Sequence, residues 1–219
     1  MRWLIFFLVL FFSPLFGDAP KAIIFDYGGV VAKVDRSPML HFLSDSLSIP
    51  YSKLRNDFAS DKLYEMIEKP PIFWKKYAKK KLPAGFESNF AMKKEQMIRK
   101  IPGMEELIIS LKSQGIQVVL LSNTKEMRAR FIEQQGGYDL FDPILLSCHL
   151  GLKKPDIRIY EKLLTLLPYK AEECVFIDNR KKNIQAAQSC GLDGIVFESV
   201  DLLKEELSKR GLGSLIKNL

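Results

Sequence analysis

The segment "AIIFDYGGVV", residues 22–31, decides the fold that this sequence predicts. Its first six residues are rich in β-branched and aromatic side chains, which favours a buried β-strand ending near Asp26. Glycines follow at positions 28 and 29, so the chain is expected to leave the strand through a turn. An acidic side chain at the end of a buried strand is a candidate nucleophile, and a simple turn residue is the alternative.

Two later segments have the same construction. "QVVLLSN", residues 117–123, and "ECVFIDN", residues 173–179, are short apolar runs that end in polar residues. "GIVFES", residues 194–199, and the shorter "LLSCHL", residues 145–150, predict further strands. Segments with helical spacing, such as "GMEELIISLKSQ" and "RKKNIQAAQSC", lie between these runs. This alternation predicts an α/β fold with a Rossmann-like parallel sheet.

The stretch between the first two strong strands has a different character. Residues 37–100 contain no strand-like apolar run, and prolines interrupt their helical segments, so we expect an inserted α-helical module. The α/β core then consists of residues 21–36 and 101–219. Because the insertion begins and ends within the core, we expect the functional site in the cleft between the two modules.

The N-terminal segment has the pattern of a secretory signal peptide. Residues 1–17, "MRWLIFFLVLFFSPLFG", place one arginine before an apolar run. Ser13 and Pro14 end this run before the roughly 20 apolar residues that a membrane span needs. The expected protein is therefore exported, either secreted or periplasmic. An uncleaved membrane anchor, a buried N-terminal element of the domain and a cytoplasmic location are the alternatives.

The charge of the chain favours anionic partners. The 219 residues carry a formal net charge of +7, which suits nucleic acid, anionic lipid or phosphorylated metabolites equally well. The basic aromatic stretch "FWKKYAKKK", residues 73–81, is where nucleic acid would be expected to bind. At helical spacing its aromatic residues form an apolar stripe and its lysines a solvated face, so we favour an amphipathic helix.

The cysteines and histidines predict no metal site. Cys-X-X-Cys or Cys/His spacing is absent from Cys148, Cys174 and Cys190. If the protein is exported, one disulfide could form, between any two of them. His41 and His149 are the only histidines, and neither has a neighbour in the sequence that suggests a metal ligand set or a catalytic triad.

Polar residues follow three of the predicted strands. In an open parallel α/β sheet, ligands bind beyond the carboxyl ends of the strands. The residues at these ends are Asp26, Ser122, Asn123 and Asp178. The segment "GLKKPD", residues 151–156, adds Lys154 directly before a proline. Two carboxylates can hold Mg²⁺ together with substrate phosphate oxygens, and a lysine beside them would neutralise an attacking carboxylate and a phosphoryl group.

The order and context of these motifs resemble the haloacid dehalogenase (HAD) superfamily of hydrolases, over residues 21–212. The helical insertion resembles the C1 cap of subfamily I. The glycine-bearing first motif, "SNT" and "GLKKPD" look most like the branch of sugar-phosphate phosphatases and epoxide hydrolase N-terminal phosphatase domains. The resemblance implies a Mg²⁺-dependent phosphatase that acts on a small phosphorylated metabolite. A nucleic-acid partner is not expected, and the sequence does not indicate an oligomeric state.

The resemblance also implies roles for single residues. Asp26 corresponds to the nucleophile that forms an aspartyl-phosphate, and Lys154 to the catalytic lysine that steadies nucleophile and phosphate. The implied substrate-binding residues are Ser122, Asn123 and Lys154. The implied metal ligands are the Asp26 carboxylate, the backbone carbonyl of Gly28 and Asp178.

Two positions depart from the family pattern. Gly28 stands where phosphatases of the family usually have the aspartate that protonates the leaving alcohol, a step that is typically worth about 10²–10⁴-fold in rate. Asn179 stands where many members have a second acid. A catalytically weak or inactive binding protein is therefore the alternative function. Dehalogenation of a small acid is a further one, which Asp178 and the glycine pair disfavour.

Overall fold

The computed structural model describes residues 19–59 and 62–213. The expected leader, residues 1–17, lies outside the described residues. Among the helices that are described, none combines the length and the apolar character required to cross a membrane.

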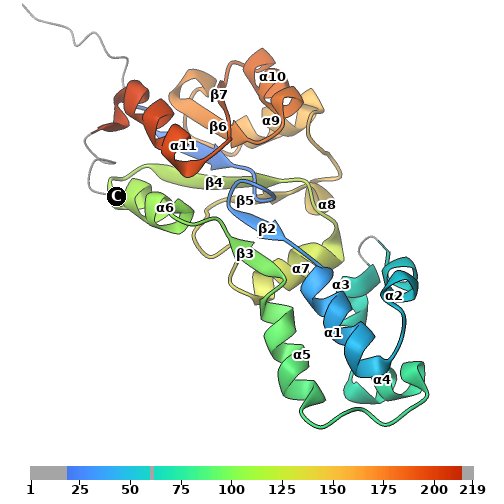
Figure 1. The fold of residues 1–219 in the computed structure, drawn as a ribbon. Helices are drawn as coiled ribbons and strands as arrows, with labels where there is room; N and C mark the ends of the chain where they lie inside the picture. Colours follow the sequence, from blue (N-terminus) through green and yellow to red (C-terminus); the bar gives the residue numbers. More distant parts are fainter. Residues whose placement is uncertain (1–18, 60–61, 214–219) are drawn as a thin grey trace, which may run out of the picture.

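A five-stranded parallel sheet, with the strand order β5-β4-β1-β6-β7, forms the centre of the α/β core (Figure 1). Its strands are β1 (Ala22–Phe25), β4 (Gln117–Ser122), β5 (Ile144–Leu146), β6 (Cys174–Asp178) and β7 (Asp193–Val196). Phe25 of β1 pairs with Leu120 of β4 on one side and with Ile177 of β6 on the other. Asp26, Ser122 and Asp178 therefore leave the sheet at the same edge. The predicted Rossmann-like α/β fold is confirmed.

Alternate residues of β1 face two helical layers. Ile24 belongs to a buried apolar cluster with residues of α9 (Ile157–Leu164) and α10 (Lys181–Ser189). Ile23 belongs to a second cluster with residues of α6 (Met104–Ser113), α7 (Glu126–Gln134) and α11 (Val200–Leu207). Because both faces of the strand are covered, its sequence is a continuous apolar run. Two short elements complete this part, the 3₁₀ turn η1 (Ala171–Glu173) and the π-helical turn η2 (Ser208–Leu212).

Five helices lie to one side of the sheet, between the second and third strands of the chain (Figure 1). They are α1 (Ser37–Leu47), α2 (Tyr51–Asp57), α3 (Lys62–Met66), α4 (Pro71–Ala78) and α5 (Phe86–Glu95). Trp74 of α4 is 1% exposed and packs edge-on against Phe58. Lys75 and Lys76 of the same helix are exposed, as expected for an amphipathic helix.

Two local predictions differ from the structure. Residues 98–100, expected to lack a strand, form β3 (Ile98–Lys100), which pairs antiparallel with β2 (Ala32–Val34). Three residues are too short to give a strand-like apolar run. The strand expected over residues 145–150 ends at Leu146, and α8 (Ser147–Leu150) follows it. Periodicity alone does not separate strand from helix in such a short apolar run.

Candidate active site

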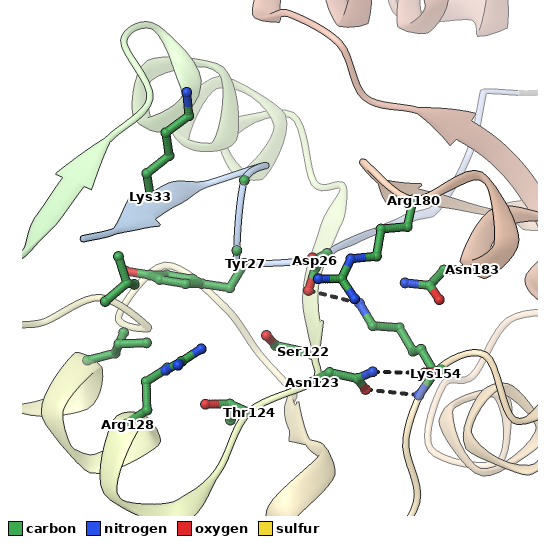
Figure 2. A pocket seen from close by; sticks show the side chains of 14 residues that line it. Asp26, Tyr27, Lys33, Ser122, Asn123, Thr124, Arg128, Lys154, Arg180 and Asn183 are labelled. Atoms are coloured by element: carbon green, nitrogen blue, oxygen red, sulfur yellow. Dashed lines mark hydrogen bonds and ion pairs between the residues drawn. The ribbon is translucent and has the colours of Figure 1, made fainter. Parts of the chain in front are cut away.

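A pocket of about 330 Å³ opens at the carboxyl edge of the sheet (Figure 2). Five residues predicted from the sequence line it: Asp26, Gly28, Ser122, Asn123 and Lys154. The sixth, Asp178, is fully buried and is not among the lining residues. The fold thus brings together residues that are more than a hundred positions apart in the chain.

Lys154 is the central cation of this site. Its ammonium lies 2.8 Å from Asp26 Oδ1 and 2.8 Å from Asp178 Oδ2, and it donates to the Leu121 carbonyl at 2.7 Å. These three acceptors use all three donors of an ammonium group. The Lys154 side chain is only 1% exposed, so little solvent screens its charge from the two carboxylates. Lys154 is therefore fixed beside Asp26 as the predicted catalytic lysine requires.

Asn123 holds the loop that carries Lys154. Its Nδ2 donates to the Lys154 carbonyl at 2.8 Å, and its Oδ1 accepts from the Lys154 backbone N–H at 2.9 Å. Figure 2 shows both contacts as dashed lines. Although Asn123 lines the pocket, these bonds give it a positioning role. Ser122, which was predicted beside it, is 4% exposed and lies between Asp26 and Thr124 at the pocket wall.

Asp178 lies behind the pocket and is held by three donors. Its Oδ2 accepts from Lys154 Nζ and from Asn183 Nδ2, each at 2.8 Å. Its Oδ1 accepts from the Arg180 backbone N–H at 2.8 Å. Asp178 therefore fixes Lys154 directly, and only Oδ1 retains room for a further partner.

The loop after Asp26 turns at Gly29. This residue has a φ of +86°, and a Cβ placed on it would lie 2.4 Å from Asn179 Nδ2, so the position requires glycine. Gly28 is different, because a Cβ there meets no atom within 4 Å and its φ lies outside the left-handed region. Within the described residues, no group donates a hydrogen bond to the Gly28 carbonyl.

Burial and charge act on Asp26 in opposite directions. Desolvation raises the pKa of Asp26 above its ordinary value, the Lys154 charge opposes this, and the Asp178 charge adds to it. Burial also raises the pKa of the neighbouring Tyr27 to about 12. A carboxylate whose charge is only partly compensated is suited to meet another cation.

The pocket wall is rich in cations. Besides Lys154, the lining includes Lys33 from β2, Arg128 from α7 and Arg180 from the start of α10, while Asp26 is the only acidic residue among them. In Figure 2 the guanidinium groups of Arg128 and Arg180 extend from opposite sides toward the region of Asp26 and Ser122. Arg128 also lies over the Tyr64 ring, 5.4 Å from its centre. This distribution of charge favours an anionic ligand.

The comparison with protein families decides the identity of the chain. A model described as haloacid dehalogenase-like hydrolase matches residues 42–197, which include Ser122, Lys154 and Asp178. The chain belongs to this family. Asp26 precedes the matched span, and the sheet places it beside the matched residues.

Several relatives of this HAD-like hydrolase are phosphatases. A sesquiterpene phosphatase of Aspergillus oryzae is 34% identical over 93 residues, 42% of this chain and 47% of that protein. A glyceraldehyde 3-phosphate phosphatase of Methanothermobacter thermautotrophicus is 29% identical over 121 residues, 53% of each chain. The chain spans about half the length or less of the first curated relatives it matches. A phosphorylated carbohydrates phosphatase of Thermotoga maritima is 24% identical over 80% of this chain and 83% of its own.

Solved structures share the fold. A HAD family enzyme of Bacteroides thetaiotaomicron, in complex with magnesium and inorganic phosphate, has a TM-score of 0.54 at 18% identity, with 83% of this chain and 96% of that chain covered. A putative HAD hydrolase of Bacillus subtilis, bound to magnesium, has a TM-score of 0.56 at 18% identity, with 87% and 100% covered. At this identity the likeness shows a common HAD fold.

Three cationic lining residues were missed from the sequence. Arg180 stands two positions after Asp178, the acid that ends a predicted strand, so its placement at the sheet edge could have been inferred. Arg128 and Lys33 carry no such signal, because Arg128 lies within a helix and Lys33 lies in a three-residue strand. Their place in the pocket wall depends on tertiary packing.

Proposed function

We propose that this HAD-like hydrolase is a phosphatase that acts on a small phosphomonoester through an aspartyl-phosphate on Asp26. The observation that carries the proposal is the placement of the Asp26 carboxylate in a cation-lined pocket, with Lys154 bound to Oδ1 at 2.8 Å. Three phosphatases among the relatives support it. The lining also favours a phosphoryl group over an uncharged substrate.

In the first step, a carboxylate oxygen of Asp26 attacks phosphorus and the bond from phosphorus to the leaving alcohol oxygen breaks. The leaving alkoxide takes a proton from a water molecule, because Gly28 offers none. In the second step, water attacks phosphorus, the bond to Asp26 breaks, and inorganic phosphate is released with the carboxylate restored. Lys154 holds the attacking carboxylate in place, and the proposed role of the Ser122 hydroxyl is to hydrogen-bond the phosphoryl oxygens.

The oxygen donors beside Asp26 fit Mg²⁺. Asp26 and Gly28 both line the pocket, and no described residue donates to the Gly28 carbonyl. Mg²⁺ is a hard cation that takes one or two carboxylates and substrate phosphate oxygens. We propose Asp26 and Gly28 as ligands, with Asp178 Oδ1 as the third protein oxygen. When bound, the ion supplies positive charge that offsets the carboxylate and the phosphoryl group.

The missing acid at position 28 sets an expectation for the substrate. Gly28 offers no proton to the leaving alcohol, so esters with good leaving groups are favoured substrates. Helices α1 to α5 are proposed to act as a cap that covers small substrates in the pocket. We also propose, from the pattern of residues 1–17 alone, that the enzyme is exported or anchored in a membrane, and we expect no nucleic-acid partner.

A ligand-binding protein without turnover is the second candidate function. It is favoured by Gly28 and Asn179, which remove the two acids usual in the family. A panel of phosphate esters, assayed with Mg²⁺ and with chelator, separates the two. Phosphate release that needs Mg²⁺ and is absent from an identically purified Asp26→Asn sample supports the phosphatase. Saturable binding of phosphate esters without release on any ester supports the binding protein.

A further inference from the structure

Outside the active site, a carboxylate, a thiol and an imidazole come together at Glu126, Cys148 and His149. One ligand atom from each of these residues lies within 4.8 Å of the others. His149 Nε2 is 3.2 Å from Glu126 Oε2. The sequence offered no such partner for His149, because Glu126 comes from a different helix and not from the local sequence.

The two elements that carry these residues are joined to each other. Glu126 is the first residue of α7, whereas Cys148 and His149 belong to α8. Just before α7, the Thr124 N–H donates to Ser147 Oγ at 2.9 Å, and this hydroxyl donates to the Thr124 carbonyl at 2.9 Å. These reciprocal bonds hold the start of α7 against the start of α8. The three ligand groups are consequently kept close without a metal, which lowers the ordering cost of binding one.

The cluster is open to solvent on one side. The His149 side chain is 57% exposed and the Glu126 side chain 46%. Cys148 and Glu126 also line a groove of about 600 Å³ that includes Thr124 and Ser147. Arg130 Nε donates to Glu126 Oε1 at 2.8 Å, while Oε2 contacts His149 Nε2 at 3.2 Å, so a metal would replace the contact between Oε2 and Nε2. An ion could thus enter, bind three protein groups and keep a water molecule.

We propose that Glu126, Cys148 and His149 form a site for a divalent transition metal, with Zn²⁺ as the best fit. Zn²⁺ takes sulfur, nitrogen and carboxylate ligands in tetrahedral geometry, and three protein ligands leave a fourth position for water. Mg²⁺ prefers octahedral oxygen ligands and is a poor fit for a thiol and an imidazole. Binding replaces the S–H bond of Cys148 by a metal–thiolate bond and releases the proton to solvent, so affinity rises with pH.

The site lies between the two loops that build the active-site wall. Helix α7 directly follows the segment that contains Ser122 and Asn123, and α8 leads through Gly151 to Lys154. A bound metal ties the first residue of α7 to α8 and so restrains both loops together. The proposal concerns metal binding and does not depend on the phosphatase activity.

Co²⁺ is the probe for this site, because a thiolate ligand gives Co²⁺ an intense ligand-to-metal charge-transfer absorption band. The full chain is titrated with Co²⁺ in excess Mg²⁺, which saturates oxygen-only sites. We expect the band in the wild type, its loss on addition of Zn²⁺, and its absence in Cys148→Ser. Cys190→Ser is the matched control, because Cys190 is another partly exposed free thiol, and this variant should keep the band.

His149→Gln provides a second variant at an exposed position, where the fold should be unaffected. We expect its Zn²⁺ affinity, measured by competition with a chromophoric chelator, to fall tenfold or more relative to the wild type. Circular dichroism verifies that each variant is folded. Absence of the charge-transfer band in the wild type, its persistence in Cys148→Ser, or an unchanged Zn²⁺ affinity in His149→Gln would each overturn the proposal.

Discussion

Lys154 and Asp26 form a buried ion pair, with 2.8 Å between Nζ and Oδ1 and a lysine side chain that is 1% exposed. The same ammonium neutralises Asp178, so its removal leaves two buried carboxylates without a cation. We expect Lys154→Met to lower the free energy of unfolding by about 3–5 kcal/mol at neutral pH. Urea denaturation measures this change. Lys153→Met, at the exposed neighbouring position, is the control and should stay within about 0.5 kcal/mol of wild type.

The pH dependence of Lys154→Met follows from the same pair. Burial already raises the pKa of Asp26 in the folded protein, and removal of Lys154 takes away the group that opposes this rise. A carboxyl with a raised folded-state pKa takes up protons more readily when folded, so its destabilising effect disappears as the pH falls. The stability difference between wild type and variant should therefore narrow from neutral pH to about pH 5. A difference that widens on acidification would contradict this assignment of charge.

The backbone allows an aspartate at position 28. A Cβ there meets no atom within 4 Å, and the left-handed φ of the loop belongs to Gly29. Gly28→Asp should fold, and if its carboxyl protonates the leaving alcohol it should raise the rate on alkyl phosphates more than on aryl phosphates, within the roughly 10²–10⁴-fold typical of general acid catalysis. The measurement is kcat/KM over a series of leaving groups. An unchanged dependence on the leaving group in a folded variant would mean that another residue already performs this proton transfer.

Gly29→Asp is the structural contrast to that variant. An aspartate at position 29 would have to adopt a φ of +86°, and its Cβ would collide with the Asn179 side chain. We expect it to lose stability, visible as a lower Tm, while Gly28→Asp keeps a Tm close to wild type.

Much of this site could be predicted because its residues stand at the ends of local patterns. The strand before Asp26 and the strand before Asp178 are covered on both faces, so each is recognisable as a short apolar run that stops at an acid. The features that could not be predicted depend on contacts between residues that lie far apart in the sequence. The bond between Asn123 and the Lys154 backbone joins residues 31 positions apart, and no periodicity indicates it. The burial of Asp178 behind Lys154 likewise follows from how the loop packs.

Asp178→Asn tests whether Asp178 is a metal ligand as well as the anchor of Lys154, and Asn179→Asp tests the effect of an added carboxylate. Asp178 Oδ2 is occupied by Lys154 and Asn183, so Asp178→Asn should both weaken Mg²⁺ binding and lower Tm. Asn179→Asp adds a carboxylate beside Gly29 and should strengthen Mg²⁺ binding, since more negative charge surrounds the ion. Isothermal titration with Mg²⁺ and thermal unfolding measure the two effects. Asp178→Asn with wild-type Mg²⁺ affinity would remove Asp178 from the ligand set and leave it as the anchor of Lys154.

Arg180 is expected to attract the anionic substrate. It lines the pocket, and no described residue forms an ion pair with its guanidinium. Arg180→Met should raise KM for a phosphate ester by about tenfold. This factor corresponds to the lower end of the roughly 1.5–3 kcal/mol that a hydrogen bond to a charged group contributes. The salt dependence of kcat/KM should weaken in parallel. Lys182→Met, at an exposed position two residues further along, should leave both quantities unchanged.

In the proposed reaction, Asp26 carries the phosphoryl group during turnover. Asp26→Asn keeps the shape of the side chain, but an amide is not a nucleophile. The most direct measurement is mass spectrometry of the protein quenched in acid during turnover of an aryl phosphate with Mg²⁺, followed by peptide mapping. We predict one added phosphoryl group on the peptide that contains Asp26 in the wild type, sensitive to hydroxylamine, and none in Asp26→Asn, which should also lose nearly all activity. An Asp26→Asn variant that is folded, active and still phosphorylated would exclude Asp26 as the nucleophile.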